Sequence, residues 1–394
     1  LKRCRGHIKM SLLDHFATEL DELKRQGNFR QFTQNVQHGR FITIQNKTML
    51  NLASNDYLGL AADIDLRQEF LDCYPLERSY FSSSSSRLLT GNFDEYEQLE
   101  NSLSQAFGGR AALLFNSGYH MNIGILPAVA DSKTLILADK LVHASMIDGI
   151  RLSGAQYVRY RHNDLQHLEQ LLQKYHDDDQ IERIIVVTES IFSMDGDETD
   201  LTALVQLKKR FAKTMLYVDE AHSIGVRGQQ GLGCAEQYNV IQEIDFLVGT
   251  LGKALAAVGG YIICHPIIKD YLINKMRPLI FSTAQPPIVM AWANFIFQKV
   301  LMAQSQREHL KNISQYLQQA VVQKGYVSPS TSHIIPVIVG ESQATIDKAK
   351  QVQESGFYAM PVRPPTVPKN SSRLRISLTS MVEQHELEAL VSFL

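Results

Sequence analysis

The sequence is poor in cysteine and has almost no net charge. Its 394 residues include four cysteines (Cys4, Cys73, Cys234 and Cys264), which form no Cys-x-x-Cys pair, and 39 basic residues nearly balance 41 acidic ones. Scattered cysteines of this kind indicate reduced thiols and a cytoplasmic protein, not a disulfide framework. The balanced charge gives no general attraction to nucleic acid or to a membrane surface.

Long hydrophobic runs are also missing. No apolar stretch approaches the roughly 18 residues that a membrane-spanning helix needs, so we expect neither a membrane nor a nucleic-acid partner, and we predict no metal site. The first ten residues, LKRCRGHIKM, are basic but have no apolar core of a signal peptide. A short transit-like leader is one interpretation; the favoured one is an upstream extension with Met10 as the true start.

The length and the pattern of apolar segments predict an α/β fold with one large and one smaller domain. From Ala111 onward, short apolar segments alternate with helical ones, which is typical of a mostly parallel sheet covered on both faces. The predicted strands are 111–115, 134–138, 157–160, 183–189, 215–219, 246–249 and 261–264.

Two further units flank this alternating region. A helix at 11–26 and a β-hairpin at about 41–52 precede it. After Pro286–Pro287 one long helical stretch runs toward about Lys324, and a smaller α+β unit follows. We therefore divide the chain into an N-terminal segment (1–50), a large domain (51–285) and a small C-terminal domain (286–394).

One lysine occupies an unusual position. Lys253 lies in TLGKALAAVGG, shortly after the apolar run Phe246–Val248. Burying a lysine is costly unless it is paired, and a Schiff base with an aldehyde is one way to lose the charge. Taken alone, a solvated loop lysine near a helix start is the more common explanation.

Other polar residues follow the predicted strands, where ligands bind in parallel α/β sheets. Gly118 and Tyr119 lie at a strand-to-helix junction, which suits a phosphate. Each residue alone has a simpler explanation, because an aspartate that ends a strand is usually a cap or turn residue and a lone histidine is usually structural. The remaining residues of this kind are His143, Ser193, Asp219, His222 and Thr250.

Two glycine-rich segments imitate nucleotide-binding loops but do not match them. The spacing in Gly225–Gly233 differs from that of a dinucleotide loop, and no clear helix follows. Residues 249–253 imitate a P-loop without its four-residue spacer and without a Ser/Thr after the lysine. These departures exclude an NTPase.

Together the polar residues fit pyridoxal phosphate. This cofactor needs a lysine for its aldehyde, an acid beside its pyridine nitrogen, a phosphate cup and a flat group over its ring. Asp219 suits the acid, because a nearby carboxylate favours the protonated ring nitrogen.

Several ordered motifs resemble those of one family. ASNDYLGL (53–60), SGYHMN (117–122), SIFSMDGD (190–197), YVDEAHSIGVRG (217–228) and TLGKA (250–254) are similar to the α-oxoamine synthases. These fold-type-I pyridoxal-phosphate transferases condense an amino acid with an acyl thioester, and the resemblance runs from about residue 11 to the end. It implies a mostly parallel seven-stranded sheet, a smaller α+β domain, and a homodimer with its site between two subunits.

Within that family, RPPTVP (363–368) with RLRISLT (373–379) is most similar to the branch that joins L-alanine to a pimeloyl thioester. The sequence leaves open whether coenzyme A or an acyl carrier protein bears the pimeloyl group. The aspartate–histidine motif is shared with relatives that use glycine or serine. A sister enzyme with one of those substrates therefore stays an alternative, as does a catalytically silent subunit of the same fold.

The resemblance also implies roles for individual residues. It makes Lys253, His143, Asp219 and His222 catalytic: Lys253 forms the Schiff base and removes the Cα proton, Asp219 pairs with the pyridine nitrogen, and His143 stacks on the ring. The implied phosphate contacts are Gly118, Tyr119, Thr250 and, from the partner subunit, Ser282 and Thr283. His222 and Ser193 are implied near the phenolic oxygen, Arg375 at the amino-acid carboxylate, Arg30 and Thr366 at the acyl group, and Asn55 and Arg363 along the pocket.

The chain departs from this family in one loop. Where many relatives have a glycine-rich GSGGSR-like segment, it has SSSSSR (82–87). Because serine adopts positive φ less readily than glycine, the conformation of this loop is left open.

Overall fold

The computed structural model describes residues 12–394. The expectation about Met10 and the start of the predicted 11–26 helix lie outside this range. The first helix, α1, spans Asp14–Arg25. No helix among residues 12–394 is long and apolar enough to cross a membrane.

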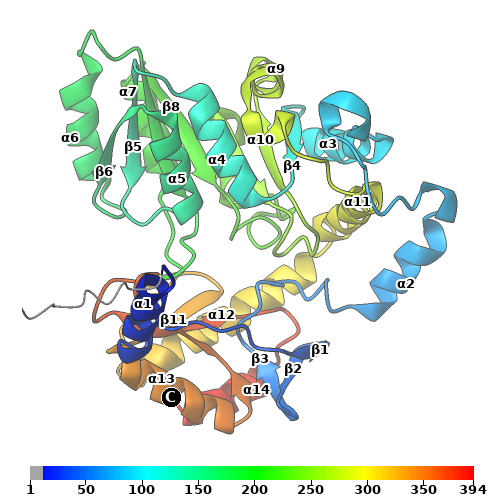
Figure 1. The fold of residues 1–394 in the computed structure, drawn as a ribbon, viewed down its shortest axis with the longest axis vertical. Helices are drawn as coiled ribbons and strands as arrows, with labels where there is room; N and C mark the ends of the chain where they lie inside the picture. The colour runs from blue at the N-terminus through cyan, green and yellow to red at the C-terminus, as the bar shows by residue number, and fades with distance from the viewer. Residues whose placement is uncertain (1–11) are drawn as a thin grey trace, which may run out of the picture.

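A seven-stranded sheet in the order β4-β10-β9-β8-β7-β5-β6 forms the upper part of the molecule in Figure 1. Only β10 runs antiparallel to its neighbours, and the other pairs are parallel. The α/β prediction is confirmed, and each predicted strand is present to within one residue at either end. The strands are β4 (Ala111–Phe115), β5 (Thr134–Asp139), β6 (Gln156–Tyr160), β7 (Arg183–Glu189), β8 (Thr214–Asp219), β9 (Phe246–Thr250) and β10 (Gly260–Cys264).

Both faces of this sheet are buried under helices. Along β5, Leu135 and Leu137 pack into one apolar cluster and Ile136 and Ala138 into the other, as the two-residue period of a strand requires. The first cluster includes residues of α3, α6 and α7; the second includes residues of α4, α5 and α9. Around the sheet lie α3 (Asp94–Ala106), α4 (Gly118–Val129), α5 (Ala144–Ser153), α6 (Leu165–His176), α7 (Leu201–Arg210), α8 (Cys234–Gln237), α9 (Pro266–Lys275) and α10 (Arg277–Ile280).

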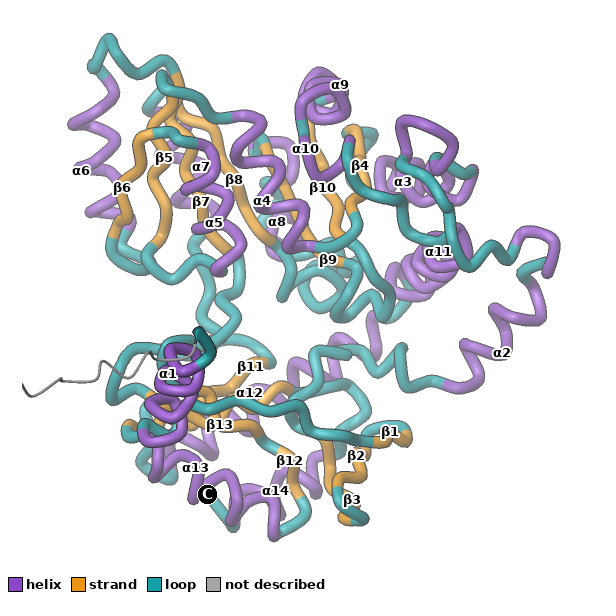
Figure 2. The backbone as a smooth tube through the Cα atoms, in the orientation of Figure 1, coloured by secondary structure: helices purple, strands orange, loops and turns teal. Residues whose placement is uncertain are grey.

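The C-terminal part is built on a three-stranded sheet in the order β11-β14-β13. Figure 2 shows loops lying between this lower part and the large sheet. Its strands are β11 (Ile334–Gly340), β13 (Met360–Val362) and β14 (Ser372–Ser377), and its helices are α12 (Gln304–Gln323), α13 (Ser342–Glu354) and α14 (Gln384–Ser392).

The long helical stretch predicted after Pro286–Pro287 consists of two helices. The chain forms α11 (Pro287–Leu301) and then α12, with a break at Met302–Ala303, where Ala303 leaves the helical region at ψ 39°. Arg307 stabilises the break, because its Nη1 donates to the carbonyl oxygen of Val300 at 2.6 Å and so satisfies a helix-end acceptor.

The predicted N-terminal hairpin is present as β2 (Phe41–Ile44) and β3 (Lys47–Asn51). Its turn residues Gln45 and Asn46 both have positive φ, the geometry that matches strand twist in tight hairpins. The short strands β1 (Val36–His38) and β12 (Phe357–Tyr358) complete a four-stranded sheet. Since β12 pairs with β3, the N-terminal segment joins the C-terminal part, while the domain boundaries at 50 and 285 stay predictions.

One residue of the serine-rich loop adopts the left-handed backbone conformation. Of residues 82–86, Ser84 alone has positive φ (53°). The loop is fixed against Ala284, whose carbonyl oxygen accepts from Ser83 Oγ at 2.6 Å and whose N–H donates to the Ser85 carbonyl oxygen at 2.9 Å. In the chain, this loop lies between α2 (Ile64–Cys73) and α3.

His162 links the end of β5 to the loop that follows β7. Its Nδ1 lies 2.9 Å from Asp139 Oδ1 and its Nε2 lies 2.8 Å from Asp197 Oδ2. Burial acts to lower the pKa of His162, but the hydrogen bonds to the two carboxylates outweigh it and raise the pKa to about 10. His162 is therefore charged at neutral pH and holds the 190–197 segment in place.

We expect His162→Gln to lower the free energy of unfolding at pH 6 by roughly 2 kcal/mol, below the range for fully buried pairs. Because the folded pKa lies above the usual 6.5, the stabilisation is complete below pH 6.5 and is lost as pH rises through about 10. Urea unfolding between pH 6 and 10.5 measures this. His15→Gln, in an exposed pair with Glu19, is the control, and a pH-independent loss in His162→Gln would contradict the expectation.

Candidate active site

The polar residues predicted for the site follow strands of the large sheet at their carboxyl ends. Asp219 ends β8 and Thr250 ends β9, while Gly118 begins α4 just after β4. Parallel strands bring these ends to one edge of the sheet, where ligands bind in this type of fold.

Lys253 is half-buried, and its Nζ makes no hydrogen bond or ion pair with any residue in the range 12–394. Burial lowers the pKa of this amine, while the charges of Asp219 and Glu189 oppose that change. A half-buried lysine without a direct partner differs from the solvated loop lysine that the local sequence alone favours. Such an amine is well suited to react with an aldehyde.

Asp219 is held by two N–H donors. Asn122 Nδ2 donates to Oδ2 at 3.1 Å, and the backbone N–H of Ala221 donates to Oδ1 at 2.9 Å. Asn122 is itself fixed, since its Oδ1 accepts from the Tyr217 hydroxyl at 2.5 Å. Sequence reasoning missed Asn122, although a single asparagine in the apolar run of α4 was the available signal.

His143 is the N-cap residue of α5. Its Nδ1 accepts from the backbone N–H of Ser145 at 3.2 Å, which leaves the proton of the neutral ring on Nε2. Burial lowers the pKa of His143. The backbone N–H of His143 donates to Glu189 Oε1 at 2.6 Å. Burial, and to a smaller extent the charge of Asp219, raises the pKa of Glu189 well above its usual value.

Ser145 connects this histidine to the buried aspartate. Its Oγ lies 2.8 Å from His143 Nδ1 and accepts from Asn122 Nδ2 at 3.0 Å. Sequence reasoning missed both Ser145 and Glu189. His143 and Asp219 are thus connected by two intervening side chains.

The start of α4 offers free backbone donors. The N–H groups of Gly118 and Tyr119 belong to the first turn, where no intrahelical acceptor exists, and this turn contains no acidic residue. The Thr250 side chain adjoins Gly118, since a Cβ added to that glycine would lie 3.6 Å from it. The Tyr119 ring is half-exposed, and its hydroxyl donates to Asp148 at 2.6 Å. An anion fits this position.

A second group of residues surrounds the guanidinium of Arg375, on β14. Its Nε donates to the carbonyl oxygen of Ser193 at 2.7 Å, and both Nη atoms lie 3.2 Å from Asn55 Oδ1. The Tyr57 hydroxyl lies 3.1 Å from the same Asn55 oxygen and 2.6 Å from His222 Nδ1. The structure therefore brings Asn55, Ser193, His222 and Arg375 together, with Ser193 contributing its backbone.

Arg30 and Thr366, predicted for the acyl substrate, form a separate group with Arg363, predicted for the pocket. Arg30 Nη2 donates to Thr366 Oγ1 at 3.1 Å, and Arg363 Nη1 donates to the carbonyl oxygen of Gly27. Burial lowers the pKa of Arg363, and the charge of Arg30 lowers it further. No hydrogen bond within residues 12–394 joins this group to Lys253.

Ser282 and Thr283 lie near β4 of their own chain. The Thr283 carbonyl oxygen accepts from Asn116 Nδ2 at 2.7 Å, and Ser282 lines a small cavity with Asn116 and His120. The predicted contact of Ser282 and Thr283 with a second subunit's phosphate stays a prediction.

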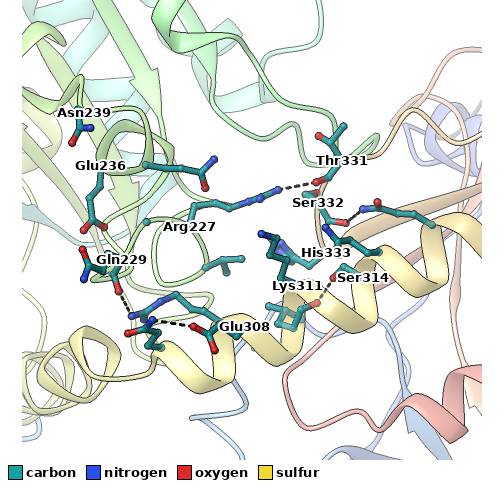
Figure 3. Close-up of a pocket in the computed structure, with 18 residues that line it drawn as sticks. Arg227, Gln229, Glu236, Asn239, Glu308, Lys311, Ser314, Thr331, Ser332 and His333 are labelled. Carbon is teal, nitrogen blue, oxygen red and sulfur yellow. Dashed lines mark hydrogen bonds between the residues drawn. The ribbon is translucent and has the colours of Figure 1, made fainter.

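A polar cavity of about 530 Å³ lies between the 226–239 loop and α12 (Figure 3). None of the predicted site residues lines it. His333 does, and its ring also packs edge-on against Tyr57 with a centroid separation of 4.0 Å. Neither ring nitrogen of His333 has a hydrogen-bond partner in the described chain. His333 therefore lies between the cavity and Tyr57, the hydrogen-bond partner of His222.

The residues at the sheet edge fit pyridoxal phosphate. They supply an unpartnered amine at Lys253, a fixed carboxylate at Asp219, and first-turn N–H donors at Gly118 and Tyr119 without a competing carboxylate. These are the groups that a pyridine aldehyde with a phosphate ester requires.

Comparisons with known proteins agree with this fit. Residues 47–394 match the family model for aminotransferase class I and II. Relatives from Pasteurella multocida (56% identical, 97% of this chain and 99% of the relative) and Haemophilus influenzae Rd (55%, 95% and 98%) are provisionally named 8-amino-7-oxononanoate synthase.

Solved structures extend the comparison to three dimensions. Serine palmitoyltransferase from S. paucimobilis with a bound PLP–myriocin aldimine has a TM-score of 0.88 at 27% identity, covering 98% of this chain and 97% of that one. An 8-amino-7-oxononanoate synthase from Francisella tularensis has a TM-score of 0.75 at 26% identity, covering 88% and 96%. The chain therefore belongs to the aminotransferase class I and II family and, within it, is a pyridoxal-phosphate-dependent α-oxoamine synthase of the 8-amino-7-oxononanoate synthase group.

Proposed function

We propose that this enzyme condenses L-alanine with a pimeloyl (6-carboxyhexanoyl) thioester in biotin biosynthesis. The products are 8-amino-7-oxononanoate, CO2 and the free thiol of coenzyme A or of an acyl carrier protein. The observation that carries the proposal is the unpartnered amine of Lys253, facing the charges of Asp219 and Glu189 at the edge of the sheet. The names of the relatives support the choice of substrates.

The chain's residues hold the cofactor in this proposal. Lys253 binds its aldehyde carbon, and Asp219 faces its pyridine nitrogen. His143 covers the ring, Ser193 and His222 lie near the phenolic oxygen, and the α4 turn with Thr250 holds the phosphate. Bound pyridoxal phosphate supplies an electron-withdrawing ring that stabilises negative charge at the amino-acid Cα.

Two residues act directly on the amino acid. Arg375 binds its carboxylate, because a guanidinium makes paired, charge-assisted hydrogen bonds with that group. This contact would orient the amino acid in the site. Lys253 Nζ then takes the Cα proton as the general base.

We assign the acyl substrate to Arg30 and Thr366, and we place Arg363 and Asn55 along the pocket. The two arginines lie close enough for the charge of Arg30 to lower the pKa of Arg363. A pair of cations of this kind is suited to a negatively charged substrate, and both a pimeloyl carboxylate and the phosphates of a carrier have that charge.

We further propose that the enzyme is a cytoplasmic homodimer. Ser282 and Thr283 would then contact the phosphate held by the other subunit. The unbonded thiols of Cys73, Cys234 and Cys264 support a reducing compartment.

A sister activity with glycine or serine is the second candidate. The similarity to serine palmitoyltransferase favours it. The two candidates share the cofactor and the roles of Lys253 and Asp219, and they differ in the amino acid and the acyl chain.

The visible absorbance spectrum of the purified enzyme with pyridoxal phosphate separates these candidates. We expect a cofactor band that changes most strongly with L-alanine and changes further when pimeloyl thioester is added. A stronger response to glycine or L-serine would keep the family and change the substrate. A wild-type protein with no band would contradict the proposed function.

We expect Lys253→Ala to abolish the Schiff-base absorbance and to lower kcat by at least about 10²–10⁴-fold, the range for losing a general base. The matched control is Lys299→Ala, which removes an amine paired with Glu69. Normal turnover in Lys253→Ala, measured by CO2 release, would refute the assigned role.

We expect Arg375→Lys to raise the KM for L-alanine about 10- to 100-fold, because a charge-assisted hydrogen bond contributes roughly 1.5–3 kcal/mol. The KM for the thioester should change much less. Arg40→Lys, at an ion pair with Glu386, is the control. Equal increases in both KM values would contradict a specific carboxylate contact.

A further inference from the structure

The Tyr57 hydroxyl occupies a fully buried position between His222 and the Asn55–Arg375 pair. The tyrosine is 0% exposed and His222 is 4% exposed. The hydroxyl lies 2.6 Å from His222 Nδ1 and 3.1 Å from Asn55 Oδ1. It carries one proton, so it donates to one of these two atoms.

The hydrogen bonds of Asn55 decide which atom receives the proton. Arg375 has no acceptor, so the Asn55 atom that faces it is the amide oxygen. That oxygen already lies 3.2 Å from both Arg375 Nη1 and Nη2, and these two donors occupy its two lone pairs. Tyr57 can also donate to Asn55 Oδ1, but that contact is longer than its contact with His222 Nδ1 (3.1 Å against 2.6 Å), which favours a tyrosine proton that points to His222.

The charge states agree with this arrangement. Burial raises the pKa of Tyr57 to about 12, against the charge of Arg375, so the phenol keeps its proton. Burial lowers the pKa of His222 well below its usual value, and Lys253, Arg375, His333 and His143 lower it further. A neutral imidazole that accepts at Nδ1 has its only proton on Nε2.

We propose that Tyr57 is a positioning residue that holds His222 as the Nε2–H tautomer and thereby presents a hydrogen-bond donor to the cofactor. The proposal rests on the proposed function, in which His222 lies near the phenolic oxygen. His222 Nε2 makes no hydrogen bond with any other residue in the described range, so this donor is available. The edge of His333 against the Tyr57 ring, at 4.0 Å, restrains the tyrosine.

The backbone holds His143 in the same tautomer. There the N–H of Ser145 donates to Nδ1, whereas His222 depends on a side-chain hydroxyl. Substituting Tyr57 by phenylalanine therefore removes the hydroxyl that contacts His222 Nδ1 without changing the backbone.

Tyr57→Phe in the holoenzyme tests the proposal. A donor to the phenolic oxygen stabilises its negative form, so losing the donor should raise the pKa read from the cofactor's visible absorbance by about one pH unit. The same substitution in a His222→Gln background should add no further shift. Tyr160→Phe removes another buried hydroxyl, on β6, and should leave this pKa unchanged.

Two results would overturn the proposal. One is a Tyr57→Phe enzyme with an unchanged absorbance pKa and a raised KM for L-alanine, because the tyrosine would then act through Asn55 and Arg375. The other is an equal pKa shift in Tyr160→Phe, which would indicate a general effect of a lost hydroxyl.

A measurement on the unmodified chain keeps the test independent of the folding of Tyr57→Phe. In the ¹⁵N-histidine NMR spectrum of the wild-type protein, with His222 assigned by its loss in His222→Gln, we expect the proton on Nε2. A proton on Nδ1 would overturn the proposal. This readout needs no cofactor or substrate. It therefore still reports the tautomer of His222 if the wild-type protein shows no cofactor band and the proposed function fails.

Discussion

The position of the Arg375 guanidinium is the constraint on which the rest of the site depends. Arg375 is 9% exposed on β14 of the C-terminal part, yet its Nε reaches the Ser193 carbonyl oxygen after β7 of the large sheet. Burying this charge is tolerable only because its donors are met by Ser193 and Asn55. Two neighbouring ion pairs hold the same loop: Arg373 pairs with Asp195, and His162 pairs with Asp197. The Arg375 end of the candidate site is therefore fixed by residues from both parts of the chain.

The other end of the site is fixed by buried hydrogen bonds within the large sheet. Asp219, Asn122, Ser145 and His143 form one chain of contacts that runs from β8 through α4 to α5. Because Asp219, Asn122 and Ser145 are each hydrogen-bonded, the low polarity of the surroundings strengthens the bonds. Only a fixed carboxylate can face a ring nitrogen in a defined direction, which is the task that we propose for Asp219.

The sequence predicted the fold better than it predicted the contacts within the candidate site. The strands were recoverable because each is a short apolar run that alternates with a helix, and β5 shows why, since both of its faces are buried. The break between α11 and α12 was missed because Arg307 stabilises it with a side-chain hydrogen bond to the Val300 carbonyl oxygen, which the apolar pattern does not indicate. Asn122 and Tyr57 were missed because each is far in sequence from the residue that it supports, Asp219 and His222 respectively.

The electrostatics around Lys253 explain why two carboxyl groups can share one small region with a single amine. Asp219 has two N–H donors, whereas Glu189 Oε1 accepts from the His143 N–H. Burial and the charge of Asp219 raise the pKa of Glu189, which disfavours a second anion beside Asp219. His143 and His222 are both neutral because burial lowers their pKa. The Asp219 carboxylate would favour a protonated pyridine nitrogen, and the Lys253 amine has no direct ion pair within residues 12–394 that would hold its proton.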